Sequence, residues 1–600
     1  MNNKKWSLFA ILLTFVLILT ACSGDSGSEK SGTEKEPEKK VDAAAFPLAV
    51  ENKDKAIDGG TMNVALVNDS PFQGVFSLVL YEDGYDADIM EFASNTIFDT
   101  DGDFLITDTG IASMKVDAPN NKVTVKIREG VKWSDGEPLK IEDLIYAYEI
   151  IGHPEYTGVR NDGDFQNIVG AVEYTAGQAE TISGLKKVDE TTLEIQFKKL
   201  SPAIYNGGDG LWTGAEPYHY LKDIPVAQLE ESDQVRKAPL SLGAYKYDNI
   251  VNGESVKFVA NEHYWKGEPK IKEIILKNVP STQIAKAIEN GDYDYVMSFP
   301  TSQFEAVKDL DNITLLGRPE LYYQYLGFKL GKYDAAKGEV VTDVAGSKMG
   351  DVKLRQAMGY AIDVEGISTE YFFDLRERAN SLIPPVFTSF YDESLKGYTY
   401  DKEKAIEILD EAGYKDVDGD GLREDPNGEK LEIKFASMSG GDTEEAVASY
   451  YMQNWKEVGL NVTLTTGRTI EFQSFYDKVK ADDPEIDVWL AAWGTGSNPS
   501  PSGLYGKESA FNYSRYSSDK LTELLTEIDS PKAIDAEYRA EKFTEWQEYM
   551  FNQAPVIPTQ YRLELVPVSK RVKGINIDYA EPNNMHEWEL TAEKAPASSK

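Results

Sequence analysis

The chain has 600 residues, a formal net charge of −39 and a single cysteine, and 41% of its residues are apolar. This length exceeds what one hydrophobic core usually supports, so we expect two or three domains. The acidic balance argues against nucleic acid and anionic lipid as partners of the protein surface, and one cysteine leaves no intrachain disulfide or multi-cysteine metal site.

Residues 1–22 have the pattern of a secretory signal. Two lysines give a basic start, residues 8–19 are mostly apolar, and a small residue precedes Cys22. The apolar run is shorter than the ~20 residues that a membrane-spanning helix needs. The string LTAC that ends at Cys22 resembles a bacterial lipobox, which implies cleavage before Cys22 and a diacylglyceryl thioether on it. The alternative is a plain signal peptide beside an incidental cysteine.

The segments at the two ends of the remaining chain have little capacity to order themselves. Residues 23–58 are rich in Ser, Gly, Glu, Lys and Ala, with no aromatic residue before Phe46. Such a segment buries too little apolar area to fold, so we predict a flexible tether at 23–58 and a similar loose tail at 591–600. Beyond the apolar run at 8–19, the sequence contains no run of eighteen apolar residues.

Strand and helix signals alternate between these ends. Alternating apolar residues or short apolar runs predict strands at 61–67, 122–127, 192–197, 255–260, 274–279, 293–297, 431–436, 461–465 and 487–493, and a last strand from Val556. Helical spacing predicts helices at 141–151, 282–289, 353–361, 401–412, 443–458 and 543–551, with Asp401 as an N-cap. Segment 274–297 forms a predicted β-α-β unit, and the overall class is mixed α/β and α+β.

Five sequence blocks together resemble the peptide-binding proteins of ABC importers, the dipeptide and oligopeptide type of extracellular solute-binding protein. The blocks are VKIREGVKWSDGEPLKIEDLIYAYEII (125–151), APLSLGAYKY (238–247), VANEHYWKGEPKIKEIILK (259–277), LRQAMGYAID (354–363) and YDKEKAIEILDEAGY (400–414). The resemblance extends over about 59–588. Two further strings, TMNVALVNDSPFQGVF (61–76) and AAWGTGSNPSPSGLYG (491–506), resemble the long oligopeptide-binding proteins of Gram-positive bacteria, including the lactococcal type.

The resemblance implies a clamshell of two lobes around a cleft. Lobe one would comprise 59–317, with an inserted subdomain at about 101–236, and lobe two would comprise 318–556. Segment 557–590 would return to lobe one, and crossings near 318–328 and 555–563 would form the hinge.

The same resemblance implies a function without catalysis. The cleft would capture an extended oligopeptide and deliver it to the permease subunits of an ABC importer, whose ATPases are separate proteins. We expect a monomer on the extracellular face of the cell membrane, held there by the lipid on Cys22, with no resident cofactor and no nucleic-acid partner.

Loops that follow strands are the expected ligand-binding positions, because open α/β sheets bind ligands outside the carboxyl ends of their strands. Core packing is the alternative for the tryptophan that ends the 487–493 strand, and a half-buried strand is the alternative for the tyrosines at 322–325. The predicted ligand-binding residues are Ser70, Phe72, Trp212, Tyr323, Trp493, Gly494, Ser497, Asn498 and Tyr516.

One departure from the family pattern concerns the peptide's amino terminus. Many family members place an aspartate just after the tryptophan, where it holds the peptide's α-ammonium group. Residues 494–498 here are Gly, Thr, Gly, Ser and Asn, and none is a carboxylate. A fixed salt bridge is therefore in doubt, and we expect a roomier site with polar and main-chain contacts.

The acidic string DVDGDGLRED at 416–425 is a candidate calcium loop. Asp416, Asp418 and Asp420 occupy its positions one, three and five, and hard carboxylate oxygens at alternating positions can surround Ca²⁺. Position twelve is Asn427 instead of the usual glutamate, so Asp425 is the candidate replacement. The alternative is an acidic turn between a helix and a strand.

Catalytic signatures are missing from the sequence. It contains neither an HExxH pair nor a GxSxG elbow, and its four histidines share no metal-ligand spacing. We therefore expect a binding protein rather than an enzyme. Two alternatives stay open: a secreted hydrolase that uses a carboxylate pair, and a receptor of the same fold that captures peptide pheromones or other solutes.

Overall fold

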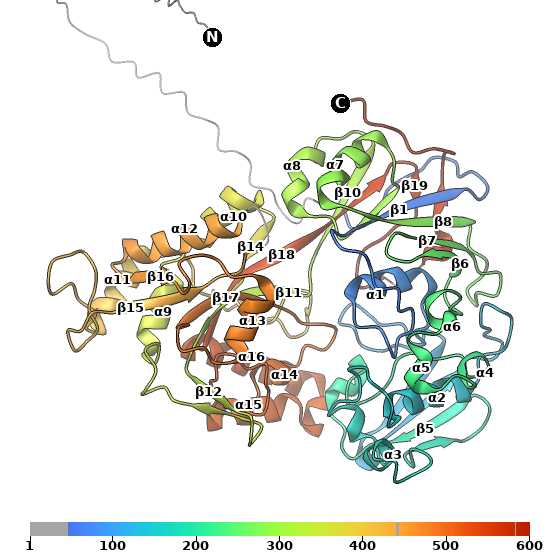
Figure 1. Cartoon of the computed structure of the whole chain (residues 1–600), viewed down its shortest axis with the longest axis horizontal. Helices are drawn as coiled ribbons and strands as arrows, with labels where there is room; N and C mark the ends of the chain where they lie inside the picture. The colour runs from blue at the N-terminus through green and yellow to red at the C-terminus, as the bar shows by residue number, and fades with distance from the viewer. Residues whose placement is uncertain (1–45, 440–442, 582–583) are drawn as a thin grey trace, which may run out of the picture. The chain divides into compact units, whose positions relative to one another are not determined.

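The structure is a computed structural model that describes residues 46–439, 443–581 and 584–600 (Figure 1). The predicted signal peptide, the lipidation of Cys22 and most of the predicted tether lie outside the described residues. Within the described ranges, no helix combines the length and the apolar character needed to cross a membrane.

Most strands belong to one large mixed sheet. Its strands are β1 (Thr61–Val67), β6 (Tyr245–Val251), β7 (Ser255–Ala260), β8 (Glu273–Val279), β9 (Tyr295–Met297), β10 (Ile313–Pro319), β11 (Tyr322–Phe328), β14 (Arg376–Arg378), β15 (Glu432–Ala436), β16 (Asn461–Leu464), β17 (Val488–Gly494) and β18 (Val556–Ser569). Hydrogen bonds order them β16-β15-β17-β11-β18-β9-β1-β8-β7-β6, and β10 and β14 also pair with β18.

The remaining strands form smaller sheets. A separate sheet has the order β2-β3-β5-β4 and consists of β2 (Ala112–Asp117), β3 (Lys122–Ile127), β4 (Leu185–Lys187) and β5 (Thr192–Gln196). Two antiparallel pairs are β12 (Gly331–Asp334) with β13 (Glu339–Thr342), and β19 (Val572–Lys573) with β20 (Glu589–Leu590).

The helices include the predicted ones and further helices that the sequence did not predict. They are α1 (Gly84–Met90), α2 (Ile141–Gly152), α3 (Ala171–Thr175), α4 (Tyr218–Leu221), α5 (Val226–Leu229), α6 (Asp233–Arg236), α7 (Ser281–Asn290), α8 (Phe304–Val307), α9 (Val352–Tyr360), α10 (Val364–Phe372), α11 (Lys402–Glu411), α12 (Glu444–Glu457), α13 (Phe472–Lys480), α14 (Ser502–Tyr505), α15 (Asp519–Ile528) and α16 (Ala536–Gln553). The predicted helices are present as α2, α7, α9, α11, α12 and part of α16. Asp401 caps α11 as predicted, because its carboxylate accepts from the Lys404 amide at 2.8 Å.

The predicted helix at 543–551 is only the second half of α16. The Asp535 side chain accepts from the Tyr538 amide, so the helix begins at Ala536. The first turns are polar and gave a weak apolar signal in the sequence. The predicted β-α-β unit is confirmed as β8-α7-β9, and β1 lies between its two strands with parallel pairing on both sides.

Strand β18 joins the two parts of the large sheet. Its first residues pair with β11, with Val556 opposite Gly327, and its later residues pair with β10, with Leu563 opposite Pro319. Figure 1 shows β18 as a long strand between the part that carries β15 and the part that carries β1. The short link from β10 to β11 therefore lies beside a strand that continues without interruption.

Buried apolar side chains gather in separate cores, as a chain of this length requires. One core surrounds β11, β15 and β17 and includes Trp455 and Trp546. Another lies between α2 and the four-stranded sheet and extends from Val75 to Leu242. Further cores flank β1, β8 and the later part of β18.

The structure differs from the predicted boundaries at the two ends. The predicted tether extends to residue 58, but from Phe46 onward the chain lies against the protein body. The Val50 amide donates to Ile575 O at 2.9 Å, and the Phe46 ring lies 6.1 Å from that of Phe304. The predicted tail also makes contacts, since the Ser598 amide donates to Glu289 O at 2.7 Å. Main-chain hydrogen bonds and a few side chains therefore hold both polar segments against the protein body.

Candidate ligand-binding cleft

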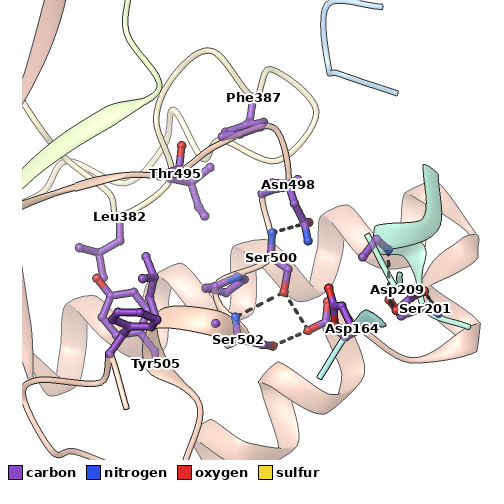
Figure 2. A pocket seen from close by; sticks show the side chains of 18 of the residues that line it. Asp164, Ser201, Asp209, Leu382, Phe387, Thr495, Asn498, Ser500, Ser502 and Tyr505 are labelled. Atoms are coloured by element: carbon purple, nitrogen blue, oxygen red, sulfur yellow. Dashed lines mark hydrogen bonds between the residues drawn. The ribbon is translucent and has the colours of Figure 1, made fainter. Parts of the chain in front are cut away.

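Two large cavities lie on either side of the paired ends of β11 and β17. The distal pocket, lined by Tyr323 and by parts of segments 163–209, 382–387 and 494–531, has a volume of about 760 Å³ (Figure 2). The hinge pocket, lined by residues beside β10, β11, β14 and β18, has a volume of about 870 Å³. Both volumes fall in the range of roughly 300–1,000 Å³ that is usual for ligand sites.

A single main-chain hydrogen bond links the two pockets. Tyr322 of β11 is opposite Gly494 of β17, and the Thr495 amide donates to Leu321 O at 3.0 Å. Thr495 lines the distal pocket and Leu321 lines the hinge pocket. The two pockets are therefore neighbours on the two sides of this strand pair, and together they are the candidate cleft.

The hinge pocket lies at the carboxyl ends of parallel strands. Asp69 follows β1, Ser281 follows β8 and Ser298 follows β9, and all three line the pocket. Open α/β sheets place ligands at this edge because the strand ends and helix starts gather polar main-chain groups there.

The loop after β17 forms one wall of the distal pocket. The Ser500 amide donates to Asn498 Oδ1 at 3.1 Å, and Ser500 Oγ donates to Asp529 Oδ2 at 2.8 Å (Figure 2). Ser502 Oγ also donates to Asp529, whose other oxygen is buried without a hydrogen-bond partner among the described residues. This wall therefore presents hydroxyl and amide groups on a rigid, proline-rich loop.

Two buried tyrosines form an inner wall of the distal pocket. The hydroxyl oxygens of Tyr323 and Tyr505 lie 2.7 Å apart, and the Tyr505 ring lies 5.7 Å from that of Trp546. Burial raises the pKa of both hydroxyls well above the usual value, so both groups stay neutral. With Leu382 and Phe387, they make this side largely apolar.

The opposite wall of the distal pocket is acidic. Asp209 accepts from the Ser201 amide at 2.6 Å and from Ser201 Oγ at 2.9 Å. Burial raises the pKa of Asp209 to about 6, and the nearby carboxylates of Asp164 and Asp529 add to the rise. The pKa of Asp164 is also raised, mainly by burial.

Charged pairs dominate the hinge pocket. Arg562 Nε donates to Glu320 Oε1 at 2.7 Å, and Arg318 Nε donates to Glu564 Oε2 at 2.6 Å. Burial alone lowers the pKa of an arginine, but these carboxylate partners raise the pKa of both. Burial raises the pKa of Tyr579, another lining residue, to about 12.

Two carboxylates at the C-terminal end of α1, Asp88 within it and Glu91 just after it, lie beside the hinge pocket. Asp88 Oδ2 accepts from Ser298 Oγ at 3.4 Å, and loss of hydration raises the pKa of Asp88 to about 6. The side chain of Glu91 is exposed, but protein atoms crowd around its carboxyl group. The loss of hydration raises the pKa of this carboxyl to about 7, and the charge of Asp88 adds to the rise. These groups could not be singled out by sequence reasoning, because the chain is rich in acidic residues throughout.

Three predicted ligand-binding residues, Tyr323, Gly494 and Asn498, line the distal pocket. The structure places the rings of Phe72 and Tyr516 in cores instead. Phe72 is 2% exposed and lies 6.2 Å from Phe76, and the hydroxyl oxygens of Tyr516 and Tyr549 are 2.9 Å apart. The sequence pattern does not show that Phe72 faces the core or that Tyr516 meets Tyr549, a residue of α16.

Ser70, Trp493 and Trp212 line neither pocket. Ser70 is exposed, and its carbonyl accepts from Asn278 Nδ2 at 2.9 Å. Trp493 stacks on Tyr513 at 5.4 Å, which matches the core-packing alternative. Trp212 is half-buried against the core next to α2.

A cross-bridge closes the cleft at the distal pocket. It consists of Asp103, Phe104 and Asn206 on one side and Phe387, Thr388, Ser389 and Ser497 on the other. Asp103 accepts from Thr388 Oγ1 at 3.1 Å and from Ser389 Oγ at 2.6 Å. Asn206 Nδ2 donates to Ser497 O at 3.2 Å, and the Phe104 ring lies 5.7 Å from that of Phe387. Predicted residue Ser497 thus joins the two sides through its main chain.

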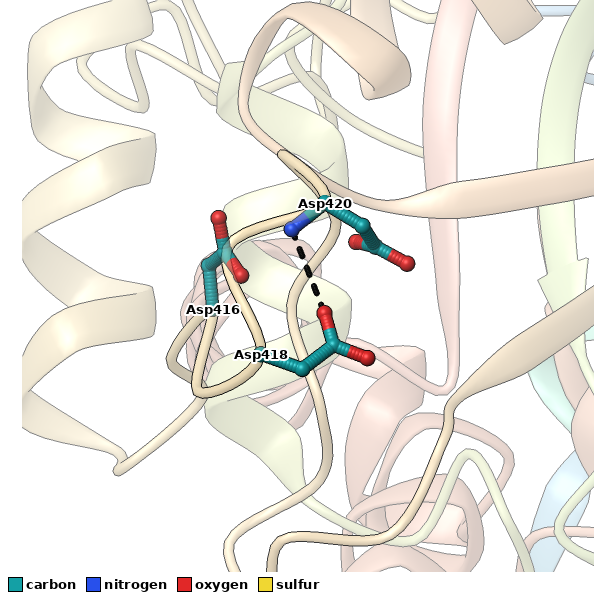
Figure 3. Close-up of side chains that lie close together, drawn as sticks. All are labelled: Asp416, Asp418 and Asp420. Atoms are coloured by element: carbon teal, nitrogen blue, oxygen red, sulfur yellow. Dashed lines mark hydrogen bonds between the residues drawn. The ribbon is translucent and has the colours of Figure 1, made fainter.

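The acidic loop brings three of its four candidate metal ligands together. Carboxylate oxygens of Asp416, Asp418 and Asp420 all lie within 4.8 Å of one another (Figure 3). Lys430 Nζ lies 3.1 Å from Asp418 and 3.3 Å from Asp420, so a cation of the protein already faces the loop. Asp425 instead accepts from the Glu429 amide at 2.8 Å. Calcium binding stays a prediction, and calorimetry on the wild type and Asp418→Ala tests it.

Comparison with known proteins identifies the family. Residues 109–515 match the family described as "Bacterial extracellular solute-binding proteins, family 5 Middle". The chain is 33% identical to the oligopeptide-binding protein OppA of Lactococcus lactis subsp. lactis, over 99% of each chain. This chain therefore belongs to the bacterial extracellular solute-binding proteins of family 5, as its sequence blocks predicted.

Solved structures agree with this assignment. Lactococcal OppA, complexed with an endogenous peptide in the closed conformation, matches with a TM-score of 0.75 and 33% identity over 89% of this chain and 100% of that chain. AppA from Bacillus subtilis, in complex with a nonapeptide, matches with a TM-score of 0.64 and 20% identity over 89% and 100%. The mixed α/β, two-lobed fold of solute-binding proteins is thereby confirmed.

Proposed function

We propose that the chain is an extracellular oligopeptide-binding protein that delivers peptides to an ABC importer. The observation that carries the proposal is the cleft of two neighbouring pockets, of about 760 and 870 Å³, beside the paired ends of β11 and β17. This cleft occurs in a chain that matches a lactococcal oligopeptide-binding protein over nearly its full length. The family is one of solute-binding proteins and not of enzymes.

Capture would depend on main-chain contacts more than on side-chain pockets. The strand pair that ends at Gly494 borders both pockets, and the main chain of a strand end suits an extended peptide, although the Thr495 amide and the Leu321 carbonyl already pair with each other. The distal pocket has neutral tyrosine and serine hydroxyls that accept varied side chains directly or through water. A peptide that contacts both sides of the cleft favours the closed state, because only that state offers both sets of contacts.

Delivery would require attachment to the cell surface and a separate transporter. The string LTAC that ends at Cys22 supports a lipid anchor, and two acyl chains give stable attachment where one does not. Two lobes with a hinge at the β10–β11 link and β18, and a monomeric state, complete the proposal. Cys22→Ala is expected to release the protein from the membrane fraction, and retention of this variant there contradicts a lipid anchor.

Native mass spectrometry of the protein as purified from cells tests the central proposal. We expect bound oligopeptides of mixed sequence, which incubation leaves uncleaved. Failure to retain any oligopeptide at micromolar concentration contradicts peptide binding, and cleavage of the peptides points to a hydrolase. Uptake of a labelled peptide by cells with and without the protein separates import from sensing.

A further inference from the structure

Two arginines lie directly opposite each other in the hinge pocket. Strand β14 pairs with β18 so that Arg376 is opposite Arg562, and both side chains line the pocket. Like charges at directly opposite positions of neighbouring strands destabilise a sheet. A sheet that keeps such a pair at the edge of a cavity points to a role for it in ligand binding.

Only one of the two guanidinium groups has a carboxylate partner. Arg562 forms an ion pair with Glu320, and its guanidinium lies 4.1 Å from the centre of the Tyr322 ring. Arg376 has no ion pair among the residues that the structure describes. Its Nη1 donates to Gln560 Oε1 at 3.4 Å, while its Nε is buried without a hydrogen-bond partner.

The side chain of Arg376 is nevertheless held in place. Its guanidinium carbon lies 3.4 Å from the centre of the Phe372 ring, so the group is stacked on the last residue of α10. A stacked guanidinium has a fixed plane and presents its donors as a fork that matches a carboxylate. Burial lowers the pKa of Arg376 to about 10, so the group is still charged at neutral pH.

Most acidic groups of the hinge pocket already have a partner other than Arg376. Glu320 pairs with Arg562, Glu564 pairs with Arg318, and Asp69 accepts from Ser281 Oγ at 2.8 Å. Glu444, at the start of α12, has a buried oxygen without a hydrogen-bond partner. These carboxylates disfavour a highly charged anion, so the site suits a ligand with one carboxylate that reaches Arg376.

We propose that Arg376 binds a carboxylate of the captured peptide, either its C-terminus or an acidic side chain. The inference rests on the proposed peptide-binding function and names the group that the hinge pocket recognises. It also fits the missing aspartate after Trp493: the peptide would be oriented by its carboxylate end instead of its ammonium end. The two possible sources of the carboxylate share one chemistry, and the test distinguishes them.

Calorimetric titration with three synthetic peptides tests this role. The first is Ser-Leu-Ala-Gln-Leu-Ala with a free C-terminus, the second is its C-terminal amide, and the third is the amide with Glu in place of Gln. The proteins are the wild type, Arg376→Gln, Arg376→Lys and the control Arg468→Gln. Arg468 is exposed and lines neither pocket, so its replacement makes the same charge change elsewhere.

The wild type is expected to bind the free acid about tenfold more tightly than the amide, because a charge-assisted hydrogen bond is lost. Arg376→Gln removes this difference, Arg376→Lys restores part of it, and Arg468→Gln keeps it. If the glutamate-containing amide regains the lost affinity in the wild type but not in Arg376→Gln, the site also takes an acidic side chain.

Two results overturn the inference while leaving peptide binding intact: equal affinity of the wild type for all three peptides, or an unchanged preference in Arg376→Gln. Loss of binding by every variant to every peptide, with the wild type included, contradicts the proposed function itself. Thermal unfolding of each variant identifies a misfolded protein, and Arg376→Lys then carries the comparison.

Discussion

The two pockets of the cleft are built in different ways. The floor of the hinge pocket adjoins β10, β11, β14 and β18, which are hydrogen-bonded members of one sheet, and ion pairs fix Arg318 and Arg562 there. The distal pocket has walls from segments 163–209 and 382–531, which meet through the cross-bridge. The floor of the hinge pocket is therefore preorganised for a particular group, whereas the size of the distal pocket depends on closure.

The largest effect is expected when the buried wall of the distal pocket is removed. Tyr505→Ala leaves a cavity beside Trp546 and leaves the Tyr323 hydroxyl unpaired. The free energy of unfolding should therefore fall by about 3–5 kcal/mol. Urea denaturation measures this change. Tyr371→Ala, in the half-buried wall of the hinge pocket, should cost less than about 2 kcal/mol. If Tyr371→Ala loses more stability than Tyr505→Ala, the wall of the hinge pocket contributes more to stability than the wall of the distal pocket, contrary to this prediction.

An intermediate effect is expected from the cross-bridge. Asp103→Ala removes the acceptor for the hydroxyl groups of Thr388 and Ser389. Because these hydrogen bonds form only in the closed state, the substitution destabilises that state relative to the open one. Peptide affinity should fall about tenfold, mainly through faster dissociation, which stopped-flow displacement measures. The exposed Asp108→Ala on the same segment is the control and should leave dissociation unchanged. An unaltered dissociation rate in Asp103→Ala means that closure does not depend on the cross-bridge.

The smallest effect concerns the carboxylates beside the hinge pocket. The folded-state pKa of Glu91 is raised to about 7, with Asp88, Arg318 and Glu564 as its charged neighbours and the tyrosine rings of Tyr295 and Tyr579 nearby. Below the ordinary pKa of a glutamate, both the folded and unfolded states are protonated, and Glu91 has no effect on stability. As the pH rises from there to about 7, the unfolded state releases the proton first, so the folded state loses stability.

Glu91→Gln should therefore flatten the fall in stability between pH 5 and 7, by about a few tenths of a kcal/mol for a group open to solvent. Chemical denaturation at several pH values measures the profile, with the exposed Glu82→Gln as the control. Parallel profiles for the wild type and Glu91→Gln contradict a raised pKa for Glu91. A large effect would mean that the hinge pocket is less preorganised than its ion pairs indicate.

Much of the fold could be predicted from local patterns. Strands β1, β3 and β7 have the predicted bounds, because each alternates apolar and polar residues or forms a short apolar run between turns. Strands β10 and β14 gave no such signal, since their pairing with β18 stabilises them more than their own sequence does. The ends of the chain were predicted from composition alone, which cannot show that Phe46 packs on Phe304.

The candidate site could be predicted in part, mainly at and after a recognisable strand. Gly494 ends the apolar strand β17, Asn498 lies in the loop that follows, and both line the distal pocket, as does the predicted Tyr323 of β11. Arg376 and Arg562 were missed because their proximity depends on the register of two strands far apart in the chain. Asp209 was missed because its burial, and not its residue type, distinguishes it from the many other acidic residues.

The position of β18 near the end of the sequence has a consequence for biogenesis. This strand lies between β11 and β9, yet it comes after almost all other elements in the order of synthesis. Until Val556–Ser569 emerges, both β9 and β11 have an open edge, and such edges are prone to wrong pairing and aggregation. The chain must therefore be synthesised as far as Ser569 before its central ladder is complete, and we expect the two open edges to need protection from wrong pairing until then.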